Sequence, residues 1–493
     1  MGTMAIGSLF YYSGYEKVYY EASDEGANPS CTEIPPSEDG SYTPPSPDPT
    51  LQLALQRISP ADYDTYCARS FDAKPEEQEC GTWQNRYTAL HERRLEQLER
   101  LKAGDFLSFQ HEDSPRYVSY LCKEDPYHRG SRSCGGLADR MSGMISTFFY
   151  ALLTDRAYLA HWKGENPVAL ETLFEKPNID WSYDPDQMQA LFRSNDSSML
   201  SYKQVNTLNA KWGYLGKLLF PNGSAQDFNH LWNASYVEMQ SNRAYIIRTF
   251  QESSIYPEWL AQVGLTKDNA FRCFTDYLFR PTIGSRRFID AYKSLFKMET
   301  VLSIGLQIRT DDSALADPEL DDNTLSKWDY FFRCANALRD THRKPHHQQV
   351  VYFLVTDSNT LRNEFVSMNH NQTLADQFVG NDTTLLVTGL PIKHLEPKVI
   401  IPKFVHKDAI SDDDNDTIAA GVNSAVIENW LLSYTNYRLI SRKGFGKMAA
   451  FHANSSRTTI NLPNLENKDV AVDCANPHSF ITFDTLSTWW SLG

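Results

Sequence analysis

The chain has none of the features that mark a membrane span, a zinc site or a nucleic-acid-binding protein. No run of 18 apolar residues occurs, so no segment has the length and apolarity of a spanning helix. Its eight cysteines form no C-x-x-C pair, which argues against zinc or thioredoxin chemistry. The chain has 47 lysines and arginines and 62 acidic residues, which give a net charge of −15. A nucleic-acid backbone is therefore not expected as the main partner.

The amino terminus also lacks the usual targeting signals. The opening, MGTMAIGSLFYY, has no basic start, no sustained apolar core and no small-residue cleavage site. Residue six is Ile, so the myristoylation pattern fails. We therefore expect either a truncated sequence or attachment to a membrane through an anchor that is absent here.

Cysteines and glycosylation sequons point to the oxidising secretory lumen. The cysteine count is even, and seven N-x-S/T sequons occur where composition alone gives roughly four. We expect one to three disulfides to form in that compartment. The sequons are at Asn195, Asn222, Asn233, Asn371, Asn381, Asn415 and Asn454.

The first hundred residues are predicted to precede the compact fold. From Asp24 to Thr50 the chain is rich in Pro, Ser and acidic residues, a composition that buries too little apolar surface to offset the entropy of ordering. We interpret residues 1–60 as a disordered stem or linker. RYTALHERRLEQLERL has leucines in a partly helical pattern, so residues 61–110 are expected to form a helical stem.

The rest of the chain alternates strand and helix patterns in two series. YVSYLC, a glycine loop, a helical pattern and AYLAHW form a βαβ unit, which requires a parallel sheet. VLSIGLQIR and QVVYFLVTDS read as buried parallel strands of a second series. We predict an α/β protein with two Rossmann-like, doubly wound domains facing a cleft that holds the ligand. The predicted boundaries are 111–290 for the N-terminal acceptor-side domain, 291–475 for the C-terminal nucleotide-sugar domain, and 476–493 for a tail packing back.

Two charged residues follow buried strands of the second series. Arg309 closes VLSIGLQIR and must leave the apolar layer at the carboxyl edge, where its planar fork can grip a diphosphate. The alternative is a buried ion pair with Asp311. Asp357, at the end of the next strand, can accept hydrogen bonds from a base or ribose, or else serve as a helix cap. Departure of a nucleoside diphosphate requires such a cation, because negative charge develops on the leaving oxygen.

Two glycine-containing turns precede helical patterns. Gly135 and Gly136 let the backbone approach a phosphate or a sugar, and Arg140 lies one helical turn further on. The second turn, SRKGFGK from Ser441 to Lys447, offers backbone N–H groups and basic side chains to phosphate. A tight structural turn and a surface turn are the respective alternatives. The acidic run SDDDND is interpreted as a solvated loop, and the chain shows no metal-ligating pattern.

Five motifs in order carry a resemblance to a known family. CGGLADRMSGMISTFFYALLTDRAYL, FTDYLFRPT, IGLQIRTDD, VYFLVTDS and ENWLLSYTNYRLISRKGFGKMAAF resemble the α-1,2-, α-1,6- and protein O-fucosyltransferase superfamily. The plant xyloglucan fucosyltransferase type is the most similar, including the final DTLSTWWSL. The resemblance runs from Tyr117 to the C-terminus, although Leu170 to Asn242 match little.

The resemblance implies a GT-B fold and an inverting, metal-independent transfer of fucose from GDP-fucose to a hydroxyl of a glycan or polysaccharide, with no cofactor. It implies residence in the Golgi and leaves open a homodimer. Arg309 would neutralise the diphosphate, Gln307 would lie beside it on the same strand face, and Asp357 would contact the nucleoside. The remaining donor-binding positions would be Gly135, Gly136, Arg140, Ser441, Lys443, Gly444 and Phe445.

The chain departs from the family at two places. The plant enzymes read S-x-x-S-T-F-G where this chain has SRKGFG, so Lys443 and Gly444 replace a hydroxyl pair. In the YIIRTFQES region only Glu252 is available as the carboxylate that would remove the acceptor proton. Two alternatives follow: a GT-B transferase with another donor, such as GDP-mannose, UDP-galactose or an arabinose nucleotide, or a catalytically silent glycan-binding protein.

Overall fold

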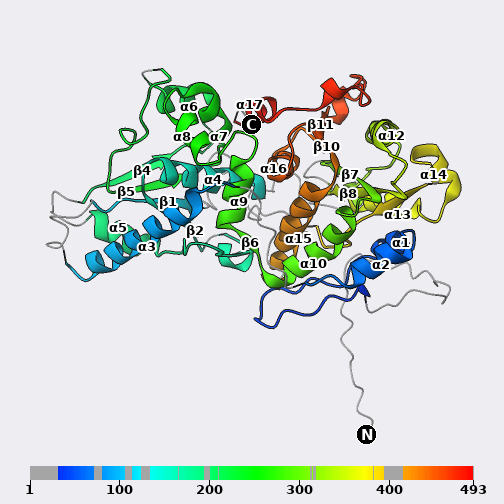
Figure 1. Cartoon of the computed structure of the whole chain (residues 1–493), viewed down its shortest axis with the longest axis horizontal. Helices are drawn as coiled ribbons and strands as arrows, with labels where there is room; N and C mark the ends of the chain where they lie inside the picture. Colours follow the sequence, from blue (N-terminus) through cyan, green and yellow to red (C-terminus); the bar gives the residue numbers. More distant parts are fainter. Residues whose placement is uncertain are drawn as a thin grey trace, which may run out of the picture.

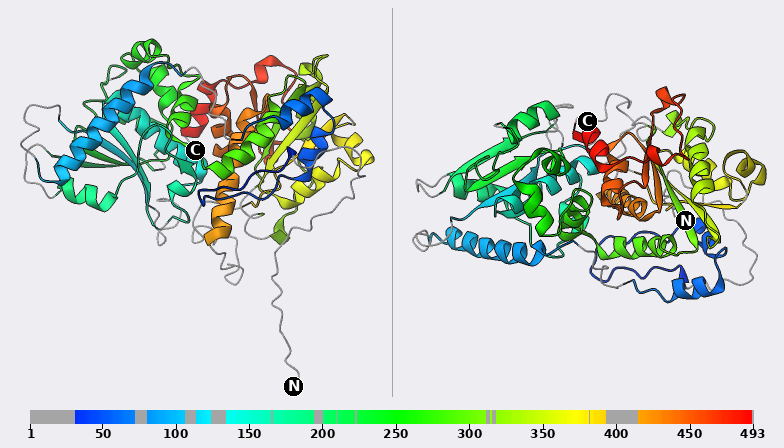
Figure 2. Two further views of the ribbon diagram at one scale, coloured as in Figure 1. Left: turned by 60° about the horizontal axis from the view of Figure 1, so that its bottom comes forward. Right: turned by 45° about the horizontal axis from the view of Figure 1, so that its top comes forward.

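Two parallel sheets covered by helices form two lobes that lie side by side (Figure 1 and Figure 2). The computed structural model describes residues 31–491 except 72–79, 106–113, 124–133, 165, 194–199, 209, 222, 311–313, 315–317, 381 and 393–414. Asp311, the partner in the alternative ion pair for Arg309, lies outside these residues, as do the sequons at Asn195, Asn222 and Asn381 and most of the acidic run SDDDND.

The N-terminal half is built on a four-stranded parallel sheet with the strand order β2-β1-β5-β4. Its strands are β1 (Tyr117–Cys122), β2 (Ala157–Trp162), β4 (Tyr202–Asn206) and β5 (Tyr236–Gln240). Both strands of the predicted βαβ unit are confirmed, and the crossover helix α4 (Leu137–Leu153) is buried along almost its whole length. Such burial on all sides explains why YVSYLC and the helix after it are so uniformly apolar.

The C-terminal half is built on a five-stranded parallel sheet with the strand order β11-β10-β7-β8-β9. Every residue of β7 and β8 is buried, as their apolar sequences predict. A two-stranded antiparallel pair, β3 (Phe174–Glu175) with β6 (Arg280–Pro281), lies apart from both sheets. The strands of the five-stranded sheet are β7 (Val301–Ile308), β8 (Gln349–Thr356), β9 (Thr383–Leu386), β10 (Tyr437–Ser441) and β11 (Thr459–Leu462).

Helices cover both sheets and join the two halves through one hydrophobic core. Side chains of α4 and α9 (Ala270–Leu278) belong to the same buried cluster as those of α15 (Asn415–Tyr434) and α16 (Gly444–His452), and α16 packs directly on α4 and α9. The C-terminal α17 (Phe483–Ser491) packs on α7 (Ile246–Glu252) and α16. The other α-helices are α1 (Pro49–Leu55), α2 (Pro60–Cys67), α3 (Trp83–Lys102), α5 (Pro185–Arg193), α6 (Trp212–Leu219), α8 (Tyr256–Gln262), α10 (Ile283–Phe296), α12 (Asp329–His342), α13 (Asn359–Ser367) and α14 (Gln372–Phe378).

The prediction of a disordered stem is wrong for residues 31–60. Helix α1 lies beside the C-terminal half (Figure 1). It packs on β9, and its Leu51 and Leu55 are buried. The Thr50 hydroxyl donates to the carbonyl oxygen of Val387, and a disulfide joins Cys31 to Cys67. A short apolar helix and a covalent link therefore offset the entropy that the Pro-rich composition alone would not.

The predicted helical stem is also part of the fold. Helix α3 packs on β2, its Trp83 is buried among the aromatic rings of Phe148, Phe274 and Tyr277, and the Tyr87 hydroxyl donates to the carbonyl oxygen of Arg156. The helix itself was predicted correctly, but its apolar stripe faces the N-terminal half rather than a separate stem.

All eight cysteines are paired, one disulfide more than the largest number we expected. The pairs are Cys31–Cys67, Cys80–Cys273, Cys122–Cys134 and Cys334–Cys474. The second pair closes 193 residues of chain and attaches the segment before α3 to α9. Among the described residues, no helix combines the length and apolarity that crossing a membrane requires.

The packing of α1 predicts a stability change that a disordered stem would not show. Leu51→Ala should lower the free energy of unfolding by about 2–4 kcal/mol, because it removes a buried side chain and leaves a cavity against β9. Gln56→Ala, at the exposed end of the same helix, is the matched control and should change the melting temperature little. Equal melting temperatures for the two variants in differential scanning fluorimetry would contradict the packing of α1.

Candidate functional site

Four of the predicted site residues lie together at the carboxyl edge of the C-terminal sheet. Gln307 and Arg309 come from the end of β7, Asp357 follows β8, and Ser441 ends β10. Strand β7 pairs in parallel with both β8 and β10, so these three strands end at the same edge. In open α/β sheets this edge is where ligands bind.

The end of β7 is locked to the end of β10 through Gln307 and Ser441. The Ser441 N–H donates to Oε1 of Gln307 over 3.2 Å, and the Ser441 hydroxyl donates to the Gln307 carbonyl oxygen over 3.2 Å. The same hydroxyl accepts the N–H of Arg309 at 3.0 Å. Gln307 and Ser441 are both buried, so they fix the backbone from which the Arg309 side chain departs.

Arg309 forms an ion pair with Asp357. Nη1 of Arg309 meets Oδ2 of Asp357, and the two side chains are 18% and 8% exposed. Oδ1 of the same carboxylate accepts the N–H of Thr310 at 2.7 Å. The alternative reading of Asp357 as a helix cap is wrong, because the Ser358 side chain caps α13 by accepting the N–H of Leu361. Asp357 instead orients Arg309 at the edge of the sheet.

The turn SRKGFGK leads into α16, as predicted. Lys443 is the exposed N-cap residue, α16 begins at Gly444, and no side chain caps this helix end. The Phe445 carbonyl oxygen accepts a hydrogen bond from Nδ2 of Asn429 over 2.8 Å. A Cβ on Gly446 would lie 2.6 Å from Oε1 of Gln307, so only glycine lets α16 approach β7 this closely. The uncapped N–H groups of α16 therefore lie beside the locked strand ends.

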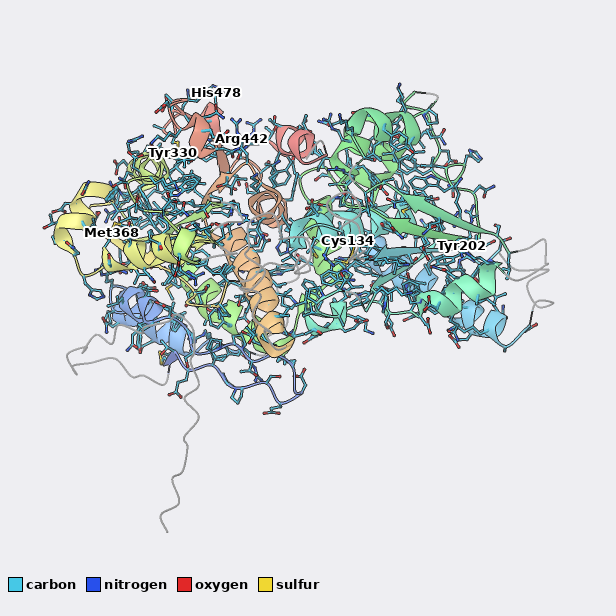
Figure 3. All side chains as sticks on the ribbon, turned by 180° about the vertical axis from the view of Figure 1, so that it is seen from behind. Cys134, Tyr202, Tyr330, Met368, Arg442 and His478 are labelled. Atoms are coloured by element: carbon cyan, nitrogen blue, oxygen red, sulfur yellow. A yellow bond between two sulfur atoms is a disulfide. The ribbon has the colours of Figure 1, made fainter. Side chains whose placement is uncertain are left out.

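The corresponding turn of the N-terminal half begins α4. Gly136 is the N-cap of α4, again without a side-chain cap, and Gly135 has φ 78°, in the left-handed region. A Cβ on Gly135 would lie only 2.6 Å from Oδ2 of Asp139. Cys134, next to this turn, lies where the two lobes meet (Figure 3).

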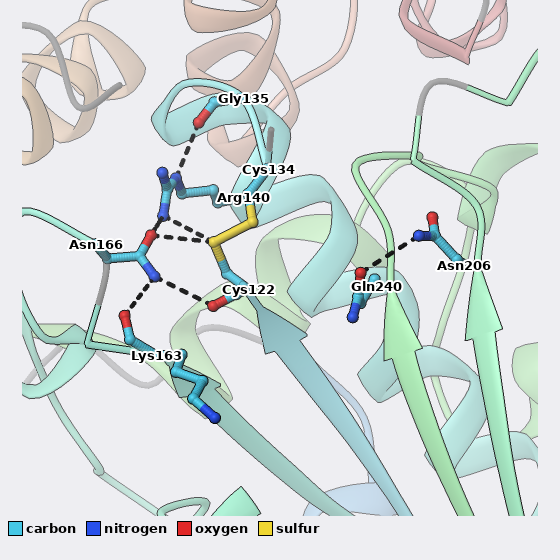
Figure 4. The surroundings of a disulfide bond; sticks show 8 residues. All are labelled: Cys122, Cys134, Gly135, Arg140, Lys163, Asn166, Asn206 and Gln240. Carbon is cyan, nitrogen blue, oxygen red and sulfur yellow. Dashed lines mark hydrogen bonds between the residues drawn. A yellow bond between two sulfur atoms is a disulfide. The ribbon is translucent and has the colours of Figure 1, made fainter. Parts of the chain in front are cut away.

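Arg140 supports this turn from behind. Its guanidinium is fully buried, donates from Nε to the Gly135 carbonyl oxygen over 2.9 Å, and binds Oδ1 of Asn166 (Figure 4). It also lies over the Trp162 ring, 4.8 Å from the centroid. The expectation that Arg140 itself lines a ligand-binding cleft is wrong, because the Cys122–Cys134 disulfide and Asn166 hold it in the interior. Its contacts with Gly135 and Asn166 are structural.

Glu252 is not brought to the strand-end residues by any described contact. It is the last residue of α7, and its carboxylate pairs with Arg248 one turn earlier at 3.5 Å. Its side chain is 37% exposed, and α7 packs on α17. The role of Glu252 as acceptor base stays a prediction.

Asp139 was not singled out from the sequence, and Lys447 was named only as the last residue of the SRKGFGK turn. Asp139 lies in the first turn of α4 and interacts electrostatically with Lys447, in the first turn of α16. Burial lowers the pKa of Lys447 to about 8, whereas Asp139 raises it. Arg243 also lies in the field of Asp139. No sequence signal links Asp139 with Lys447, because α4 and α16 come together only in the folded chain.

Two cavities lie at the opposite, amino-terminal edges of the sheets. One, of about 900 Å³, is lined by Arg86, Arg93, Arg94 and Arg116 near the starts of β1 and β2. The other, of about 580 Å³, is next to the starts of β7 and β10. Neither contains a strand-end residue of the candidate site, so the predicted interdomain cleft stays a prediction. Among the described residues, no three His, Cys, Asp or Glu side chains cluster as metal ligands do.

Comparisons with known proteins agree with the motifs. The sequence model of the xyloglucan fucosyltransferase family matches residues 127–325. Fucosyltransferase 3 of Arabidopsis thaliana is 28% identical over 225 residues, which are 44% of this chain and 39% of that protein. The match thus spans well under half the length of this curated relative.

Among solved structures, a mutant of Arabidopsis thaliana FUT1 in complex with GDP superposes with a TM-score of 0.52 at 16% identity, covering 84% of this chain and 88% of that one. NodZ alpha-1,6-fucosyltransferase with GDP, at 14% identity, covers 70% and 94% with a TM-score of 0.38. The likeness to FUT1 shows the fold, which is GT-B.

The surroundings of Arg140 predict a stability role. Arg140→Leu should lower the free energy of unfolding by about 3–5 kcal/mol, because it leaves the Gly135 carbonyl and the Asn166 amide buried without their charged partner. Arg86→Leu, which removes an exposed arginine paired with Asp155, is the control and should cost less than about 1 kcal/mol. Chemical denaturation would refute the structural role if both variants were equally stable.

Proposed function

We propose that this chain is a member of the fucosyltransferase superfamily and that it transfers fucose from GDP-fucose to a hydroxyl of a glycan or polysaccharide. The transfer inverts the anomeric carbon and needs no metal. The observation that carries this proposal is the position of Arg309 at the carboxyl edge of the donor-side sheet, oriented by Asp357.

Arg309 supplies the charge that the reaction needs. When the bond between fucose and the diphosphate breaks, its electron pair goes to the leaving oxygen of GDP, where negative charge builds up. A guanidinium held beforehand beside that oxygen stabilises the charge without reorganising. Its fork also matches two phosphate oxygens, which a single ammonium cannot do.

Asp357 acts through Arg309 in this proposal. One of its oxygens accepts the Thr310 N–H and the other pairs with the guanidinium, so both are engaged within the protein. This arrangement favours a positioning role over the nucleoside contact that the family resemblance implies. Gln307 and Ser441 likewise serve the geometry of Arg309 through their backbone lock.

The first turn of α16 binds the phosphates from the other side. Its N–H groups at Gly444 and Phe445 have no side-chain cap, and the helix dipole adds positive potential there. Lys443 adds an exposed cation at the N-cap. Gly135 and Gly136 present the second uncapped helix end, that of α4, from the acceptor side.

The acceptor oxygen attacks the anomeric carbon on the face opposite to the departing GDP, and its proton must leave. Glu252 is the candidate acceptor of this proton. Because the transition state is loose and cation-like, it needs little help from a base that removes the acceptor proton. The Golgi lumen suits a chain whose eight cysteines are all paired, because disulfides persist in the secretory pathway.

The proposal predicts a selective response to guanine nucleotides. GDP and GDP-fucose should raise the melting temperature in differential scanning fluorimetry, whereas UDP should not, because ligands that bind only the folded state stabilise it. Release of GDP should then depend on a glycan acceptor. A response to UDP alone would identify another donor, and acceptor binding without any nucleotide binding would identify a catalytically silent protein.

The position of Arg309 predicts a large loss of activity on a mild substitution. Arg309→Lys should lower kcat/KM for GDP-fucose about 10²- to 10³-fold, because an ammonium keeps the charge but loses the bidentate fork. Lysine is preferable to alanine here, since alanine would leave the buried carboxylate of Asp357 unpaired. Arg333→Lys, on the exposed face of α12, is the matched control. Equal activity of the two variants would refute the role of Arg309.

A further inference from the structure

The two cavities at the amino-terminal edges of the sheets each have a glycosylation sequon in their lining. Asn233 lines the cavity of about 900 Å³ near the starts of β1 and β2, and Asn454 lines the cavity of about 580 Å³ near the starts of β7 and β10. Asn371, the third sequon asparagine whose side chain the structure describes, is the N-cap of α14 and lines neither of these cavities. The candidate site for the donor makes no use of either cavity.

Asn233 and Asn454 are well placed for covalent modification. Both residues are exposed and lie in irregular segments, one before β5 and the other between α16 and β11. Neither side-chain amide makes a hydrogen bond with another described residue, so each Nδ2 is available for a new bond. N-linked glycans are bulky and require asparagines at the protein surface, which both residues satisfy.

Each cavity has the size and the lining for sugar rings that start at its sequon. Cavities of such volumes hold drug-sized ligands, and the first two rings of an N-glycan, both N-acetylglucosamine, are no larger. The larger cavity offers the Arg86 guanidinium and the Ser201 hydroxyl to sugar hydroxyls, and Leu90 to an apolar ring face. The smaller cavity offers His346 and Met298 in the same way. Because the glycan is tethered at the cavity wall, weak contacts suffice to keep it there.

We propose that Asn233 and Asn454 carry N-linked glycans and that the first sugar rings of each glycan lie in the cavity beside it. In the attachment step, Nδ2 of the asparagine bonds to C1 of the first N-acetylglucosamine of a lipid-linked oligosaccharide and loses one proton. The bond from C1 to the lipid diphosphate breaks, and its electron pair leaves with the diphosphate. This inference goes beyond the transfer of fucose and requires only that the chain passes through the secretory lumen.

Glycans in these cavities leave the candidate site open. Arg309 and Asp357 lie at the carboxyl edge of the C-terminal sheet, whereas both cavities lie at the opposite ends of the strands. The two glycans therefore cover a face of the protein that is remote from the donor. The proposed function can fail without affecting this inference.

Peptide mass spectrometry tests the attachment. The chain is secreted from mammalian cells grown with kifunensine, so that its N-glycans stay high-mannose. Endoglycosidase H leaves one N-acetylglucosamine on each modified asparagine, and we expect this added mass on the peptides that contain Asn233 and Asn454. An unmodified Asn233 or Asn454 in the secreted protein refutes the proposal for that residue.

The rate of trimming by endoglycosidase H tests the position of the sugars. The enzyme reaches a glycan only while it is outside the cavity, so trimming at Asn233 and Asn454 should be about tenfold slower in the native than in the unfolded protein. Asn371 is the internal control, because a glycan on this exposed N-cap should be trimmed at similar rates in both states. Equal native and unfolded rates at Asn233 and Asn454, or an equal slowing at Asn371, would refute the position in the cavities.

A cavity-filling variant gives an independent measurement. Ala89 is an exposed residue of α3 that lines the larger cavity, so Ala89→Trp should raise the native trimming rate at Asn233 about tenfold and leave that at Asn454 unchanged. Ala61→Trp, at an exposed position of α2 outside both cavities, is the matched control. An unchanged rate at Asn233 in folded Ala89→Trp would refute the position of that glycan. If Ala89→Trp does not fold, the comparison of the native with the unfolded wild-type protein decides alone.

Discussion

The ion pair between Arg309 and Asp357 is the interaction on which the candidate site depends. Arg309 follows a fully buried strand, and its side chain is only 18% exposed. A largely buried guanidinium without an acidic partner would cost free energy of folding. Asp357 compensates the charge from the neighbouring strand, and the Ser441 hydroxyl fixes the backbone from the strand on the other side. Because all three strands are parallel, a single sheet edge brings the three groups together without a long loop.

A second constraint is the close approach of α4 and α16. A glycine shapes the start of each helix, since Gly135 takes a left-handed conformation before α4 and Gly446 leaves room for the Gln307 side chain beside α16. The two helices present uncapped N-termini, and Asp139 and Lys447 lie in their first turns. The uncapped N-termini of both helices carry the positive ends of their helix dipoles.

Local patterns predicted the parts of the fold that depend on neighbouring residues. The strands ending in Cys122, Ile308 and Thr356 were found because a buried parallel strand is apolar at every position. Placement of Arg309 and Asp357 at one edge followed from the same reasoning. Composition was misleading for α1, because it averages over a segment in which a few leucines decide the outcome.

The remaining features depend on contacts between distant residues, which one sequence does not reveal. Arg140 faces inward because Asn166 and the Cys122–Cys134 disulfide meet it there, and all three are separated in sequence. The pairing of Cys80 with Cys273 and the packing of α4 on α16 have the same origin.

The most direct test of the central claim is a crystal structure of this protein with GDP bound. We predict that the guanidinium of Arg309 lies within hydrogen-bonding distance of a diphosphate oxygen while Asp357 still contacts it. A complex in which GDP is bound and its diphosphate makes no contact with Arg309 would contradict the account.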